Sequence, residues 1–197
     1  MVATHLIKQG GLRRLAVAGA AGLGLVLALV LPAAAQAEER VCRGALGAIT
    51  VDNLRVPQSA TCTLNGTRVK GTVKVERSAT LTADGIRVIG NVQAENARQV
   101  TVRSSQVGGS VQVVQGRAAT VRGTTINGDL LYDTNRAALR AIRNVVGGNI
   151  QAFQNTGGVE ITSNRVDGNL QCKENVPAPT GGGNVVQGNK EDQCARL

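Results

Sequence analysis

Residues 90–113, GNVQAENARQVTVRSSQVGGSVQV, contain one complete repeat of this chain, which runs from Gly90 to Gly109. Each of the two glycines is followed by a small polar residue and then by valine. The same pattern recurs along the chain, at a spacing of 19 and later 20 residues. A fixed period of this length indicates an architecture in which each unit is one stacked element. The repeat is marked by Gly71, Gly90, Gly109, Gly128, Gly148, Gly168 and Gly188.

Apolar and polar residues alternate after each glycine, as in Val92-Gln93-Ala94. Such alternation predicts a strand with one buried face. Two further apolar columns precede the next glycine, so each unit supplies three short strands separated by polar corners. We therefore predict an all-β fold, a single-stranded parallel β-helix (solenoid) of about seven coils of 19–20 residues, over 53–188. We expect the helix to be right-handed, because crossovers between parallel strands are strongly biased to the right hand.

The composition fits a narrow solenoid core. The chain of 197 residues has 25 glycines, no tryptophan, one tyrosine and one phenylalanine. Aromatic rings supply the bulkiest burial in an ordinary globular core, whereas stacked coils can bury columns of small aliphatic side chains. We expect Tyr132 and Phe153 at inward or corner positions, which leaves no surface on which bases could stack. No nucleic-acid partner is therefore expected.

The segment 1–37 is expected to be a cleavable signal peptide. Three cations precede an apolar run at 15–31, and Ala35-Gln36-Ala37 has the small-x-small pattern of a cleavage site. Cleavage after Ala37 would leave an exported, periplasmic or extracellular protein without a transmembrane segment. A retained membrane anchor is the alternative, and Arg13-Arg14 leaves twin-arginine export open beside the general pathway.

Removing this segment takes three cations and no acidic residue, which lowers the formal net charge from +9 to +6. It also removes His5, the only histidine, so the mature chain lacks histidine bases and ligands. The expected organisation is a signal peptide at 1–37, an N-terminal cap at 38–52, the β-helix repeats at 53–188 and a C-terminal cap at 189–197.

The four cysteines are predicted to form two disulfides, Cys42–Cys62 and Cys172–Cys194. Each pair is separated by about one coil, and adjacent coils lie about 4.8 Å apart, within disulfide reach. The other pairings would cross at least five coils. A zinc site is the alternative for four thiols, but the pairs stand at opposite ends of the chain, so no metal and no cofactor are expected.

Asparagines recur in step with the repeat and are predicted to form structural ladders. Stacked amides can hydrogen-bond from coil to coil, and asparagine tolerates the left-handed backbone that corners require. Amides that bind sugar are the alternative. The two main columns are Asn144, Asn164 and Asn184, and Asn135, Asn155 and Asn175.

Arginine columns are the main candidates for binding. A planar guanidinium suits carboxylate, sulfate or phosphate, so an anionic polymer such as an acidic polysaccharide is a candidate ligand, and a solvated surface that resists aggregation is the alternative. The candidate anion-binding residues are Arg98, Arg117 and Arg136 in one column and Arg103 and Arg122 in another.

Two other patterns of outward residues are weaker indications of function. Threonines at 63, 82, 101 and 120 resemble the flat threonine array of an ice-binding β-solenoid, but ordinary strand propensity explains them. Glu76 and Glu95 share a column with Asp133, and glycoside hydrolysis needs paired carboxylates. Val114 interrupts that column and Arg77 stands beside Glu76, so no catalytic residues are expected.

The corners Gly90-Asn91-Val92-Gln93 and Gly168-Asn169-Leu170-Gln171 resemble those of bactofilin-like β-helix proteins, and the end of the chain is similar to the endings of exported bacterial repeat proteins. Pectate-lyase-like solenoids share this type of fold. The bactofilin resemblance implies a scaffold that assembles end to end, but the signal peptide and the disulfides depart from that pattern.

The first expectation for function is a non-enzymatic, exported structural or interaction protein that forms a rigid rod, with itself as a possible partner, end to end or laterally. The alternatives are a binding module for an anionic cell-envelope polysaccharide, through the arginine columns, and a carbohydrate-active enzyme.

Overall fold

The computed structural model describes residues 38–197. The predicted signal peptide, 1–37, lies outside the described residues. Within 38–197 the chain forms 25 strands and no helix, and the strands make three parallel sheets of nine, eight and eight strands. The fold is a β-solenoid, as the repeat predicts.

Each coil contributes one strand to each sheet. Sheet A contains β1 (Glu39–Val41), β4 (Asn53–Val56), β7 (Val73–Val75), β10 (Val92–Glu95), β13 (Val111–Val114), β16 (Leu130–Asp133), β19 (Ile150–Phe153), β22 (Leu170–Lys173) and β25 (Lys190–Asp192). Sheet B contains β2 (Gly44–Leu46), β5 (Thr61–Asn65), β8 (Thr80–Asp84), β11 (Gln99–Arg103), β14 (Ala118–Arg122), β17 (Leu139–Ile142), β20 (Val159–Thr162) and β23 (Thr180–Gly182). Sheet C contains β3 (Thr50–Val51), β6 (Arg68–Val69), β9 (Arg87–Val88), β12 (Gln106–Val107), β15 (Thr125–Ile126), β18 (Val145–Val146), β21 (Arg165–Val166) and β24 (Val185–Val186).

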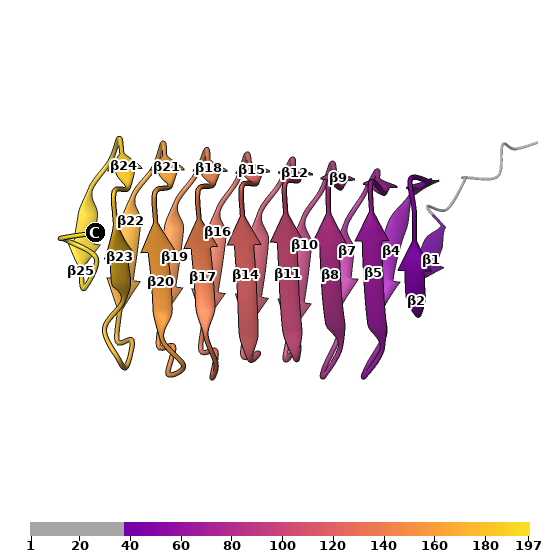
Figure 1. Cartoon of the computed structure of the whole chain (residues 1–197), viewed down its shortest axis with the longest axis horizontal. Helices are drawn as coiled ribbons and strands as arrows, with labels where there is room; N and C mark the ends of the chain where they lie inside the picture. Colours follow the sequence, from indigo (N-terminus) through magenta and orange to yellow (C-terminus); the bar gives the residue numbers. More distant parts are fainter. Residues whose placement is uncertain (1–37) are drawn as a thin grey trace, which may run out of the picture. The chain divides into compact units, whose positions relative to one another are not determined.

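The path of the chain is right-handed. Figure 1 shows it rising through sheet B in front, crossing at sheet C and descending through sheet A behind, while it advances toward the C-terminus at the left. Successive strands pair in register, so that Val92 lies beside Val73 on one side and beside Val111 on the other. Every residue therefore lies over its counterpart in the neighbouring coil.

The strands make about eight turns, one more than the seven predicted. The additional turn lies in 38–52, where β1 pairs with β4. Its register joins Glu39 to Asn53, a separation of 14 residues, whereas Leu54 pairs with Val73, 19 residues later. A short coil without the marker glycine does not follow the period, which is why the repeat alone did not reveal it.

The core is formed by the inward columns of the three sheets. Val92, Val111 and Leu130 follow one another in sheet A and are completely buried. Burying a side chain of this kind contributes roughly 1.5–3 kcal/mol, and the columns repeat that contribution in every coil. The core also holds Tyr132, whose hydroxyl donates to the backbone oxygen of Arg140, 2.8 Å away on sheet B.

The marker glycines are required by close approach of neighbouring coils. None of the seven has a positive φ. At Gly168 an added Cβ would lie 2.7 Å from the backbone oxygen of Gly148 and 2.5 Å from Oδ1 of Asn149. That oxygen accepts a hydrogen bond of 2.8 Å from the backbone N–H of Asn169. Glycine therefore leaves room for a side-chain oxygen that links one coil to the next.

Left-handed backbone is found at other corner positions, including Ser78, Gln115 and Arg143. The asparagines of the two main columns do not adopt it, so the expectation that they stand there to satisfy left-handed corners is wrong. Their role is hydrogen bonding, because all six residues are buried and none is more than 6% exposed.

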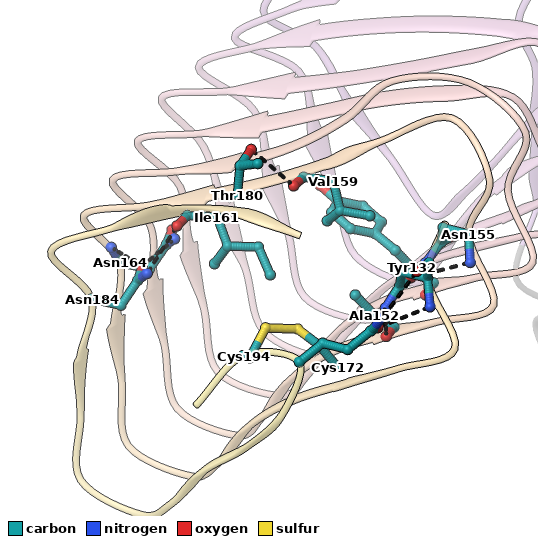
Figure 2. The surroundings of a disulfide bond; sticks show 12 residues. Tyr132, Ala152, Asn155, Val159, Ile161, Asn164, Cys172, Thr180, Asn184 and Cys194 are labelled. Carbon is teal, nitrogen blue, oxygen red and sulfur yellow. Dashed lines mark hydrogen bonds between the residues drawn. A yellow bond between two sulfur atoms is a disulfide. The ribbon is translucent and has the colours of Figure 1, made fainter. Parts of the chain in front are cut away.

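The asparagine columns are continuous ladders. Asn164 Nδ2 donates to the backbone oxygen of Ala141 at 2.8 Å and to Asn184 Oδ1 at 2.9 Å. Asn164 Oδ1 accepts from the backbone N–H and the Nδ2 of Asn144, both at 3.0 Å. Figure 2 shows members of this ladder and of the one that contains Asn155. Every buried side-chain nitrogen and oxygen within 38–197 has a partner.

Both predicted cysteine pairs lie at disulfide distance. The Cα atoms are 5.7 Å apart in Cys42–Cys62 and 5.2 Å apart in Cys172–Cys194. The second pair, drawn in Figure 2, fastens the segment after β25 to β22. In that segment the side chain of Gln193 accepts from the backbone N–H of Asn175 at 2.9 Å and donates to its carbonyl at 3.0 Å. Gln193 thus ends the second ladder.

We predict that Asn164→Ala lowers the free energy of unfolding by about 3 kcal/mol, because buried groups left without partners cost roughly 1–3 kcal/mol each. Asn189→Ala is the matched control, since the Asn189 side chain makes no hydrogen bond within 38–197. Urea unfolding of the two variants checks this. Equal losses would contradict a stabilising role for the ladder.

Burial raises the pKa of Tyr132. Because the chain has one tyrosine and no tryptophan, alkaline absorbance reports this ring alone. We predict that the folded protein keeps Tyr132 protonated well above pH 10 and that ionisation accompanies unfolding, whereas in concentrated denaturant the ring titrates near a pKa of about 10. Because folding raises the pKa, the stability due to burying the neutral ring is fully present below the unfolded pKa of about 10. It is lost as the pH rises above that value. Titration near pH 10 without unfolding would contradict the burial.

Candidate anion-binding face

Three successive strands of sheet B, β11, β14 and β17, have arginines at both ends. Arg98 immediately precedes β11 and Arg103 ends it, while Arg117 and Arg122 hold the same places in β14. The third strand, β17, follows Arg136 and is followed directly by Arg143. We call this surface the basic face; it comprises Arg98, Arg103, Arg117, Arg122, Arg136, Arg140 and Arg143.

Strand periodicity and register place these side chains on the outside. In β11 the inward residues Val100 and Val102 are buried, and Arg103 is exposed. Arg103 pairs in register with Arg122, so their Cα atoms are about 4.8 Å apart, the spacing of neighbouring strands. Arg98 and Arg103 are five residues apart, or roughly 17 Å along an extended strand. The face therefore has two rows of arginines, one at each end of the strands.

The two predicted columns are thus the two edges of one surface. Sequence reasoning did not group Arg143 with Arg103 and Arg122, because Ile142 takes the register position opposite Arg122. The threonine column lies between the rows, with Thr101 opposite Thr120 and Arg140 next in register. It forms the floor of the basic face.

Most of the positive charge on this face is not neutralised. Within 38–197 only one of its seven arginines forms an ion pair, Arg140 with Glu160 at 3.3 Å. Asp84 is opposite Arg103 in register, but no carboxylate lies within 4.0 Å of the Arg103 guanidinium. Like charges directly opposite each other destabilise a sheet, so stacking arginines without acids costs stability.

Some cations of the other faces have carboxylate partners. Arg55, on sheet A, contacts Glu39 at 2.7 Å and Glu76 at 3.6 Å. The hydrogen bond that Arg55 donates to Glu39 raises the pKa of Arg55. On the sheet C side, Lys70 lies 2.9 Å from Asp52 and lowers the pKa of that carboxyl. Arg68 and Arg87 on sheet C also lack a carboxylate within 4.0 Å, but within 38–197 the basic face holds the larger group of unpaired arginines, six on three successive coils.

The predicted carboxylate pair lies on sheet A. Glu76 and Glu95 line a hollow of about 690 Å³ together with Lys74, Gln93 and Gln112. Glu76 also accepts a hydrogen bond of 3.0 Å from the backbone N–H of Gln58. The lining mixes acids, bases and amides, so it presents no isolated pair of carboxylates.

The two aromatic residues lie away from the basic face. Tyr132 is fully buried in the core. Phe153 is half-buried on the outer side of sheet A, in register with Asp133 and Lys173. The expectation of an inward or corner position holds for Tyr132, but Phe153 faces outward, because it ends the strand at an outward position of the alternation.

No protein-family model matches the chain, and neither a curated protein nor a solved structure matches it. The two disulfides indicate an oxidising, extracytoplasmic environment. Among residues 38–197 we find no helix long and apolar enough to cross a membrane. The same residues contain no cluster of three metal-ligating side chains.

Proposed function

We propose that this protein is an extracytoplasmic, non-enzymatic binding rod that holds an anionic cell-surface polysaccharide on its basic face. The observation that carries the proposal is the double row of arginines on three neighbouring strands, of which six lack a carboxylate partner. Such an arrangement costs stability without a ligand. A polyanion would remove that cost by placing negative charge between the rows.

A polymer suits the face better than a small anion. One exposed ion pair contributes about 1 kcal/mol or less, so a single contact cannot hold a ligand. Several contacts on one chain add through their high effective concentration. The rigid solenoid fixes the arginines at the coil spacing of about 4.8 Å, so a chain with regularly spaced charges can meet several at once.

A polysaccharide suits it better than a nucleic acid. Single-stranded nucleic acids are bound by stacking bases on aromatic side chains as well as by charge. Within 38–197 the basic face carries no aromatic residue, and its floor is made of threonines. Thr101 is only 4% exposed, so the half-buried Thr120 is the threonine there whose hydroxyl can hydrogen-bond to sugars. The predicted signal peptide and the two disulfides support a partner outside the cytoplasm.

We predict that the protein is retained on immobilised dextran sulfate and is released by added salt, because exposed ion pairs are screened within about 10 Å at 0.1 M salt. The variant Arg98→Gln, Arg117→Gln, Arg136→Gln should bind at least tenfold more weakly. The control Arg68→Gln, Arg87→Gln, Arg165→Gln removes the same charge from sheet C and should keep most of the affinity.

Equal weakening of the two triple variants would mean that net charge alone attracts the polymer, and the proposed face would be wrong. Retention of the unmodified protein that does not change with salt would contradict an electrostatic mode. Tighter binding to single-stranded DNA of equal charge would favour a nucleic-acid partner instead.

Self-association is a second candidate function, and the last coil favours it. The strands β23 and β24 have no following strand in sheets B and C within 38–197, and Val185 in β24 is 60% exposed. An edge with free backbone groups can pair with another chain.

We expect Val185→Lys to dissociate any oligomer in sedimentation velocity, with Val145→Lys, on an inner strand, as control. A monomer at all concentrations would contradict this function and leave the binding rod untouched.

A further inference from the structure

A hollow of about 590 Å³ lies at the corner between sheets B and C, on the coils of the basic face. It is lined by Arg103, Ser104, Arg122, Gly123 and Arg143. Three guanidinium-bearing residues on three successive coils thus surround one concave region. We call it the corner pocket.

The local backbone explains why these three arginines meet. Arg103 and Arg122 end β11 and β14 in register. The next strand, β17, ends at Ile142, so Arg143 occupies the turn itself, with a left-handed φ of 54°. Bulky residues adopt this conformation at a cost of roughly 1–2 kcal/mol. The turn therefore directs a third arginine into the row from a different backbone position.

The middle of the corner pocket is open. Gly123 occupies the turn position between Ser104 and Arg143, also with a left-handed φ, of 57°. A Cβ added to Gly123 would have no atom within 4 Å. The backbone N–H groups of Ser104, Gly123 and Arg143 each donate to the neighbouring coil at 3.0 Å. These N–H groups are already bonded, so the positive charge of the pocket comes from the three arginines that line it.

The number of guanidiniums identifies the chemical group that fits. A carboxylate has two oxygens, and the fork of one arginine can satisfy both. A phosphate monoester presents three strong acceptor oxygens, and a sulfate ester has the same tetrahedral shape with three terminal oxygens. Each guanidinium offers five N–H donors, so three of them can each bind a different oxygen. A tetrahedral oxyanion uses this arrangement, whereas a uronate leaves two arginines repelling each other.

We propose that the corner pocket is a specific site for one sulfate or phosphate ester group, held between Arg103, Arg122 and Arg143. This inference rests on the proposed function and narrows it, because it makes the bound polymer a sulfated or phosphorylated one. The other row, which contains Arg98, then binds further charges of the same polymer about 17 Å away along the strands.

The test measures binding of inorganic sulfate, inorganic phosphate and acetate to the protein by calorimetry at constant ionic strength. We expect saturable binding of sulfate and phosphate with a dissociation constant in the millimolar range, and at least tenfold weaker binding of acetate.

Two variants distinguish specific binding at the corner pocket from general attraction by positive charge. Arg122→Lys keeps the charge but loses the fork, and we expect it to weaken sulfate binding at least fivefold and to weaken retention on dextran sulfate as well. Arg117→Lys, the matched change at the other end of the same strand, should leave sulfate binding unchanged. Both positions are exposed, so folding is preserved, which circular dichroism checks.

Three results would overturn the corner pocket. They are acetate binding as tight as sulfate, equal effects of the two lysine variants, or no saturable sulfate binding. If any of them occurs while retention on dextran sulfate still depends on Arg98, Arg117 and Arg136, the corner pocket is wrong and the proposed function stands. If retention is also independent of those residues, both proposals fail.

Discussion

Parallel hydrogen bonding between successive coils is the constraint on which the rest of this structure depends. It sets each residue directly over its counterpart one repeat earlier, at about 4.8 Å, so a choice made at one position is repeated along the rod. Apolar positions become the buried columns of the core. Polar corner positions become ladders, because amides such as Asn164 can bond both the preceding and the following coil. A marker glycine such as Gly168 is needed where a side-chain oxygen must lie against the next backbone.

The same stacking makes charge on the surface cumulative. A single exposed arginine contributes little to the binding of an anion. In-register repetition on β11, β14 and β17 produces two rows of arginines at fixed spacing. On sheet A the stack places acids near a base, around Arg55. The physical basis for assigning binding to sheet B is its group of six arginines without a carboxylate partner, on three successive coils. The disulfides serve the stack differently, since each fastens a terminal coil to its neighbour.

Much of this could be predicted from the sequence, because a period of 19 to 20 residues fixes both the strands and their register. The cysteine pairing and the ladder columns follow from that register. The first coil could not be predicted, because its 14-residue step from Glu39 to Asn53 breaks the period. The glycine requirement was not visible either, since close approach depends on backbone positions in three dimensions. Arg143 was missed because Ile142 takes the register position opposite Arg122, which places the third arginine one residue later, in the turn.

The central claim is that anionic polymer binds sheet B through the arginine rows. The most direct measurement is the NMR spectrum of the arginine side-chain N–H groups in isotope-labelled protein during titration with a sulfated oligosaccharide. The account predicts shifts and slowed exchange for the six unpaired arginines of the basic face, and unchanged signals for Arg68, Arg87 and Arg165 on sheet C. Equal shifts on both sheets, or shifts confined to sheet C, would contradict it.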